Sequence, residues 1–227
     1  MQQPDPVAPH GFFDGRQRAT IAAAMARIIP TDDTPGAAEA GTINFVDRYL
    51  AGIEGIFARP DGSGFEVLTG KQAAAWTGRI AALRETYLAG IADLDRLSEA
   101  RFAASFVHLT PGEQDEVLAE LERPAARQEA AMATEAAVAA AEPALQQMVA
   151  EADLPFFPLL VLHTRQGFYA DPIYGGNQGH AGWRAIGFPG PASLAETHAG
   201  RYSTLPYFAP GATVTGEEAA SGNEAKA

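Results

Sequence analysis

Large apolar residues recur every three or four positions through much of the chain, a spacing typical of amphipathic helices. Within residues 38–57, Phe45, Tyr49 and Ile53 fall on one helical face. The segment 71–91 repeats this spacing with Trp76 as its first large ring. The pattern therefore predicts a helix over each of these two segments.

Polar capping residues indicate where two further helices begin. Asp14 followed by Gln17 resembles a capping box, in which each side chain bonds the other residue's backbone N–H. This pair predicts a first helix over residues 14–29. Ser98 is expected to cap another helix, because large apolar residues align behind it at helical spacing. Those residues are Phe102, Phe106 and Leu109.

The second half of the chain is also read as mainly helical. Residues 110–113 combine an N-cap threonine, a proline at the first helical position and a glutamate at the third, which predicts a short helix ending before Pro124. Residues 125–151 are rich in alanine, and Pro143 is expected to kink or split the helix they form. Residues 155–162 are densely apolar and predict a buried helix.

Glycine, proline and aromatic residues are concentrated in residues 167–190, called the C-terminal loop below. Such a segment is expected to be an ordered, irregular loop, since glycine widens and proline narrows the allowed backbone angles. We expect a mostly α fold with one helical domain over residues 12–190. Residues 1–11 should be extended, and residues 191–227 should form an extended tail that is disordered towards its end.

Composition excludes several classes of function. The net charge of −12 argues against nucleic acid or an anionic membrane as a partner. The absence of cysteine excludes disulfides, thiolate chemistry and cysteine-held metal or haem in this chain. No apolar run reaches the roughly 18 residues of a membrane span. Hydrophobic residues make up 47% of the chain, which is ample for a sizeable core.

Known enzyme motifs are not found either. Gly175 and Gly176 lack the strand–turn–helix context of a dinucleotide site. The C-terminal loop could bring His163, Asp171 and His180 together as metal ligands. A histidine that bonds the loop backbone is favoured over such a metal site. The neighbouring acids at 32 and 33 suggest paired carboxylates, yet the surrounding threonines and proline favour a turn. We expect no catalytic, cofactor-binding or metal-binding residue in this chain.

Three segments together resemble one family, the small subunit (subunit 3) of gluconate 2-dehydrogenase and of related membrane-linked fructose, sorbitol and glucose dehydrogenases. The C-terminal loop carries the run GFYADPIYGGN at residues 167–177, followed by Gly-Trp at 182–183 and GFPG at 187–190. Residues 26–37 carry the run ARIIPTDDTPGA, and residues 159–164 precede the loop in a matching way. The resemblance covers about residues 12–190.

This resemblance implies a non-catalytic subunit that supports the folding, stability and export of a larger flavoprotein. In the family, that partner has a glucose-methanol-choline oxidoreductase fold, binds FAD and oxidises a sugar, polyol or aldonic acid. A cytochrome subunit with haem c often carries the electrons onward. Gluconate, fructose, sorbitol, glucose and glycoside 3-oxidation all stay open as the reaction of the complex.

Family resemblance also implies a periplasmic complex, with a cytoplasmic one as the alternative. Family members often begin with a twin-arginine export signal. Here Arg16 and Arg18 precede only a short apolar stretch, which also fits an amphipathic helix, so no export signal is recognisable.

Aromatic residues in the C-terminal loop and tail are the predicted contacts with the flavoprotein, because rings with a polar tip suit interfaces. The predicted contact residues are Phe168, Tyr169, Asp171, Pro172, Tyr174, Asn177, Trp183, Phe188, Tyr202 and Tyr207. Trp183 and Tyr174 are the expected hot spots. Three alternatives stay open: a loop that only packs on itself, a contribution of Tyr174, Asn177 and Trp183 to the active-site entrance or electron path, and an independent small-molecule-binding domain.

Overall fold

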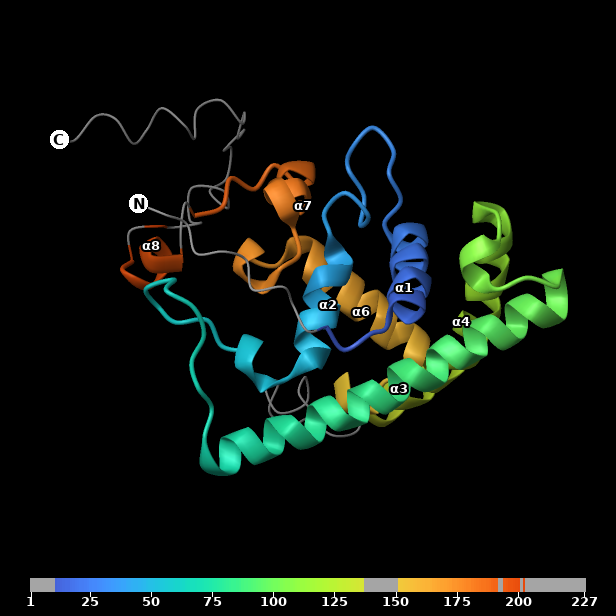
Figure 1. Ribbon diagram of the computed structural model, residues 1–227, viewed down its shortest axis with the longest axis horizontal. Helices are drawn as coiled ribbons and strands as arrows, with labels where there is room; N and C mark the ends of the chain where they lie inside the picture. Colours follow the sequence, from blue (N-terminus) through green and yellow to red (C-terminus); the bar gives the residue numbers. More distant parts are fainter. Residues whose placement is uncertain (1–10, 137–150, 192–193, 201, 203–227) are drawn as a thin grey trace.

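A computed structural model describes residues 11–136, 151–191, 194–200 and 202. Five longer helices are found among these described residues, and Figure 1 shows the length of α3 running along the lower side of the molecule. Their bounds are α1 Gly15–Ile28, α2 Thr42–Ala51, α3 Gly70–Phe102, α4 Pro111–Ala136 and α6 Phe156–Tyr169. The short elements are the 3₁₀ turns η1 Ile53–Gly55, η2 Phe106–His108, η3 Pro172–Tyr174 and η4 Gln178–His180, and the helices α7 Ala181–Ala185 and α8 Leu194–His198. The described residues form no strand, which agrees with the predicted mostly α fold.

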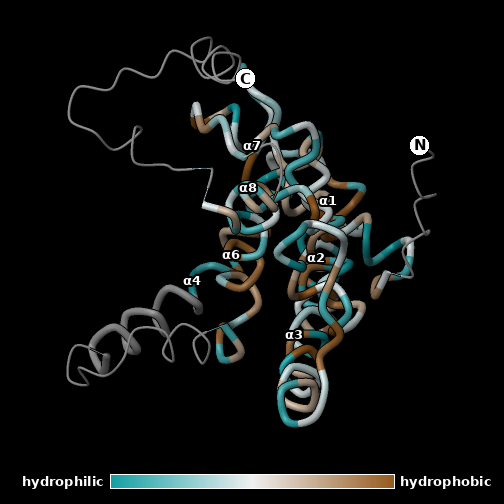
Figure 2. The backbone as a smooth tube through the Cα atoms, turned by 90° about the vertical axis from the view of Figure 1, so that its left-hand side faces the viewer, coloured by the Kyte–Doolittle hydropathy of each residue, from teal (hydrophilic) through white to brown (hydrophobic). Residues whose placement is uncertain are grey.

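The helix α6 lies at the centre of the core. It packs against α1, α2, α3 and α4, and its Leu159 and Leu160 are fully buried. Figure 2 shows hydrophobic stretches along α6, α2 and α3. The dense apolar run at 155–162 therefore forms the buried helix that the sequence predicts, because a helix surrounded by other helices can be apolar on most of its faces.

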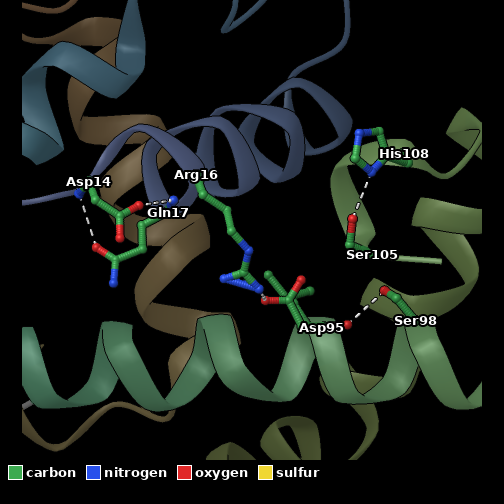
Figure 3. Close-up of polar contacts among 8 residues, drawn as sticks. Asp14, Arg16, Gln17, Asp95, Ser98, Ser105 and His108 are labelled. Atoms are coloured by element: carbon green, nitrogen blue, oxygen red, sulfur yellow. Dashed lines mark hydrogen bonds and ion pairs between the residues drawn. The ribbon is translucent and has the colours of Figure 1, made fainter.

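The first helix begins at the predicted capping box. Asp14 accepts a hydrogen bond from the Gln17 N–H at 2.8 Å, and the Asp14 N–H donates to the Gln17 side chain at 3.0 Å. Figure 3 shows this pair, together with the ion pair by which Arg16 joins α1 to Asp95 of α3. Arg18, two positions later, contacts the buried carboxylate of Asp47. Arg16 and Arg18, which precede the short apolar stretch, thus join α1 to α3 and α2 through ion pairs.

The prediction of a separate helix capped by Ser98 is wrong. A single helix, α3, runs from Gly70 to Phe102, and Ser98 lies inside it. The Ser98 hydroxyl is fully buried and donates to the Leu94 carbonyl at 2.6 Å. Serine is satisfied inside a helix by such a bond one turn back. The local capping signal was therefore overridden by burial.

Three further helix boundaries differ from those predicted. The second helix is shorter, because it begins after Gly41 and gives way to the turn η1 at Gly52. Residues 106–108 form a 3₁₀ turn rather than part of a helix. The capping box at Thr110 and Glu113 is confirmed, but α4 runs beyond Pro124 to Ala136. One proline removes a single hydrogen bond, and the alanines after it favour helix.

The segment between α2 and α3 folds back on itself. Ala58 and Phe65 form an antiparallel bridge around the loop at residues 60–64. Phe57 packs edge-on against Trp76 in the first turns of α3. Called the 57–66 hairpin below, this segment lies against the C-terminal loop, because Phe65 contacts the Tyr174 ring.

The C-terminal loop is more regular than expected. Its first three residues complete α6, and the rest contains η3, η4 and α7. The tail predicted to be extended from residue 191 contains the short helix α8, so that part of the prediction is wrong. The expected kink at Pro143, residues 1–10 of the predicted extended segment and the tail after residue 202 lie outside the described residues. No helix in the described part of the chain is long and apolar enough to cross a membrane.

Candidate functional site: the C-terminal loop and the pocket beside it

Two buried side chains hold the C-terminal loop in its shape. Asn177 is fully buried, donates to the Ala170 carbonyl at 2.9 Å and accepts from the Gly182 N–H at 2.8 Å. Trp183 donates from Nε1 to the Tyr169 carbonyl at 2.8 Å. The bonds to the Ala170 and Tyr169 carbonyls join the turn η4 and the helix α7 to the end of α6. The loop is therefore anchored by polar groups that would be costly to bury unpaired.

Two glycines let this loop approach α6 closely. A Cβ at Gly176 would overlap the Gly167 carbonyl, and one at Gly182 would overlap the Phe168 carbonyl. Any side chain at either position would force the backbones apart. These contacts explain why glycine stands at both places in the run that carries the resemblance.

The C-terminal loop lies against the run at residues 26–37 and the residues directly after it. The Gln178 N–H donates to the Ala40 carbonyl at 2.9 Å, just beyond the run at residues 26–37. Ala40, Phe168 and Ala181 form a small second core, against which Ile29 packs. The sequence offered no sign of this contact, because it joins segments far apart in the chain.

Several predicted interface residues face inward instead. Phe168 is 2% exposed, Asn177 is fully buried and Trp183 is 5% exposed. The Trp183 ring stacks on His180 at 4.9 Å and meets Phe188 edge-on at 5.4 Å. For these three residues the self-packed alternative describes the geometry. A direct contact with a partner would require the loop to open.

The other predicted interface residues that the structure describes lie nearer the surface. Tyr169 is 40% exposed, and Phe188 is half-buried against Tyr202. Asp171 accepts from the Ile173 N–H at 2.9 Å and caps η3, in which Pro172 stands at the first position. Tyr174 packs on the 57–66 hairpin, where its hydroxyl lies 3.4 Å from the Ala58 N–H. Tyr207 lies outside the described residues.

Ile186 was missed by the sequence analysis. Its side chain is 59% exposed directly after α7, which makes it the most exposed large apolar residue of the C-terminal loop. Periodicity gave no signal for it, because exposure in an irregular loop depends on how the loop folds. With Tyr169 it gives the loop two exposed apolar side chains.

In the run at residues 26–37, Asp32 and Asp33 do not form a catalytic pair. Asp32 accepts from the Thr34 N–H at 2.8 Å and from the Thr34 hydroxyl at 2.9 Å, which holds the Asp32 pKa below its usual value. Glu39 bonds the Gly36 N–H at 3.0 Å and the Thr31 hydroxyl at 2.6 Å. The turn before α2 is therefore built by Asp32 and Glu39, and Asp32 has the structural role predicted for it.

The three candidate metal ligands do not come together. His163 is buried in the core, Asp171 caps η3 and His180 stacks on Trp183. No cluster of three metal-binding side chains occurs among the described residues. The expectation that a histidine bonds the loop backbone is also wrong for His163, whose partners are two side chains.

A polar chain in the core joins Tyr87, His163, Glu151 and Arg79. The His163 Nε2–H donates to the Glu151 carboxylate at 2.7 Å, so Nδ1 is left to accept from the Tyr87 hydroxyl at 2.9 Å. Arg79 forms an ion pair with the same carboxylate. Burial, reinforced by the Arg79 charge, lowers the His163 pKa to about 3, so the ring is neutral at ordinary pH.

Glu151 lies at the wall of a pocket of about 460 Å³ between α2, α3 and α6. Most of its lining is apolar or aromatic, with a few polar groups among the rings. The lining residues are Phe45, Arg48, Tyr49, Gly55, Ile56, Trp76, Glu151, Gln166, Tyr169, Ala170 and Tyr174. The sequence did not single out this pocket, because its walls come from segments spread over most of the chain.

The described residues define an all-helical domain whose C-terminal loop is packed against its last long helix. A family model described as gluconate 2-dehydrogenase subunit 3 matches residues 15–190. The chain belongs to this family, as the two runs and the segment at 159–164 indicate. Searches of curated proteins and of solved structures returned no match.

Proposed function

We propose that this chain is the non-catalytic small subunit of a membrane-linked, FAD-dependent dehydrogenase that acts on a sugar, polyol or aldonic acid. Its role is to bind the flavoprotein subunit of the glucose-methanol-choline type and to support that subunit's folding, stability and export. FAD and the substrate site belong to the flavoprotein, and haem c to a third subunit where one is present. The complex works in the periplasm.

The observation that carries this proposal is the family match over residues 15–190, which includes both runs. The contacts between them support it further. The C-terminal loop is fixed to α6 by Asn177 and Trp183 and presents Tyr169 and Ile186 outward. A rigid loop with exposed apolar side chains loses little entropy on docking, which favours a stable interface.

Co-expression with a flavoprotein subunit of the same complex tests this function. The chain should co-purify with it, and the pair should contain FAD and oxidise a sugar or aldonate with a dye acceptor. The chain purified alone should show neither a flavin spectrum nor turnover. Activity of the isolated chain, or a flavoprotein that is equally soluble and active without it, contradicts the proposal.

A further inference from the structure

The pocket between α2, α3 and α6 has the size and the lining of a small-molecule site. Its volume of about 460 Å³ falls within the roughly 300–1,000 Å³ of typical ligand pockets. Five of its lining residues carry aromatic rings, and they come from four separate segments. These residues are Phe45, Tyr49, Trp76, Tyr169 and Tyr174.

The rings on two sides of the pocket are held in place by the fold. Tyr49 stacks on Phe45 at 6.0 Å between ring centres. Trp76 is held by Phe57 on one side, and Tyr174 by Phe65. Flat apolar walls that are fixed in advance suit a planar or ring-shaped ligand, because the protein loses little side-chain entropy when it binds.

The charges at the walls select the sign of the ligand. Both oxygens of Glu151 are engaged, one by His163 and the other by Arg79, so its charge is balanced within the protein. The Arg79 guanidinium also lies over the Trp76 ring at 4.9 Å, which covers a face that a ligand cation would use. A cationic ligand would therefore find neither a free carboxylate at Glu151 nor that face of Trp76.

Arg48 is the remaining charged group of the pocket. It donates to the Ile173 carbonyl at 2.7 Å and lies over the Phe65 ring at 5.8 Å. It forms no ion pair with any carboxylate of the described residues. A guanidinium has five N–H donors in a planar fork, and one bond to a carbonyl leaves several of them for a carboxylate.

We propose that this pocket binds a small organic acid with a planar or ring-shaped apolar body, whose carboxylate pairs with Arg48. The apolar body lies between the rings of Tyr49, Trp76 and Tyr169. Glu151, held by Arg79 and His163, forms part of the inner wall. The site shares Tyr169 with the surface proposed for the flavoprotein but does not include Ile186, and its test uses the chain without the partner.

Three probes with one ring system separate the effect of charge from that of shape. Isothermal titration of the full chain with 2-naphthoate, 2-naphthamide and 2-naphthylmethylamine compares an anion, a neutral group and a cation. The naphthoate should bind at least about tenfold more tightly than the other two, as expected for one charge-assisted contact. Equal binding of all three probes, or no binding of the naphthoate, overturns the proposal.

Variants at Arg48 test the assigned residue. Arg48→Gln keeps a donor for the Ile173 carbonyl but loses the charge, so naphthoate binding should fall to the level of the amide. Arg48→Lys should restore part of the preference. Arg96→Gln is the matched control, because Arg96 is exposed on α3 and pairs with Asp93. Circular dichroism verifies that each variant is folded, and unchanged naphthoate affinity in Arg48→Gln contradicts the assignment.

Co-purification with the flavoprotein subunit distinguishes a small acid from a protein segment as the occupant. If Arg48→Gln binds the flavoprotein normally and the complex of the natural chain still binds naphthoate, the small-acid assignment stands. If Arg48→Gln no longer binds the flavoprotein, and the complex of the natural chain does not bind naphthoate, a protein segment fills the pocket and the assignment is wrong. Failure of the chain to bind any flavoprotein concerns the proposed function alone, because the titrations use the chain by itself.

Discussion

His163 Nε2 donates a 2.7 Å hydrogen bond to Glu151 in the interior of the domain, which ties the centre of α6 to the wall of the pocket. The ring is neutral although a carboxylate lies beside it, because burial disfavours its charged form and the positive charge of Arg79, which pairs with that carboxylate, adds to the effect. The folded state therefore favours the neutral form of the His163 ring.

Lower pH should therefore destabilise the fold through His163. Its pKa is about 3 in the folded chain and about 6.5 when unfolded, so stability is complete above pH 6.5 and is lost as the pH falls towards 3. At pH 5.5 the loss from this residue should be on the order of 1 kcal/mol. Urea unfolding at pH 7.5 and 5.5 measures it. His163→Gln should lose less stability over the same interval, and an equal loss in both proteins contradicts the assignment.

Trp183→Ala should destabilise the domain strongly rather than only weaken partner binding. The ring is buried, bonds the Tyr169 carbonyl and fills the space beneath Gly190. Truncation of a buried tryptophan typically costs about 3–5 kcal/mol. Trp183→Phe keeps most of the packing and should cost less. Thermal melts of both variants test this, and a normal melting temperature in Trp183→Ala would show that the ring is not part of the core.

Ile186→Ser should weaken the complex with the flavoprotein while leaving the melting temperature unchanged. Its side chain is 59% exposed, so the folded chain gains little from it. An interface hot spot typically contributes roughly 2 kcal/mol or more. Val67→Ser is the matched control, because Val67 is also apolar and exposed but lies outside the C-terminal loop. Pull-down with the flavoprotein subunit compares them, and equal binding by both variants and the natural chain removes Ile186 from the interface.

Two glycines of α3 should respond in opposite ways to alanine. A Cβ at Gly90 would overlap the Phe156 ring, whereas one at Gly78 meets no atom within 4 Å. Alanine favours a helix over glycine by about 1 kcal/mol, but overpacking costs about 1–3 kcal/mol. Gly78→Ala should therefore raise the melting temperature and Gly90→Ala should lower it. A rise in both would mean that α6 does not pack on α3 as closely as the structure has it.

Asp32→Ala should lower the melting temperature, whereas the activity of the complex per assembled unit should stay near normal. Asp32 holds the turn before α2 through the N–H and hydroxyl of Thr34. Asp33 is its neighbour control, and Asp33→Ala should have the smaller effect on melting. A large loss of turnover at unchanged stability would instead assign Asp32 a role in the reaction of the complex.

Local signals in the sequence determined much of the helical framework. The capping boxes at Asp14 and Thr110 fix the start of α1 and α4, because they act through hydrogen bonds to residues three positions away. The apolar run at 155–162 likewise predicted a buried helix. The two runs that indicated the family were readable for the same reason, since each is a continuous segment.

Tertiary structure decided what these local signals leave open. Ser98 carries a capping residue's side chain but is buried within α3, because the apolar face of that helix continues past it. Trp183 and Asn177 lie inward, where their polar atoms bond the carbonyls of Tyr169 and Ala170 at the end of α6. The contact between Tyr87 and His163 joins residues 76 positions apart, and no local pattern encodes it. The pocket at Arg48 depends on the same long-range packing, so only the folded chain reveals it.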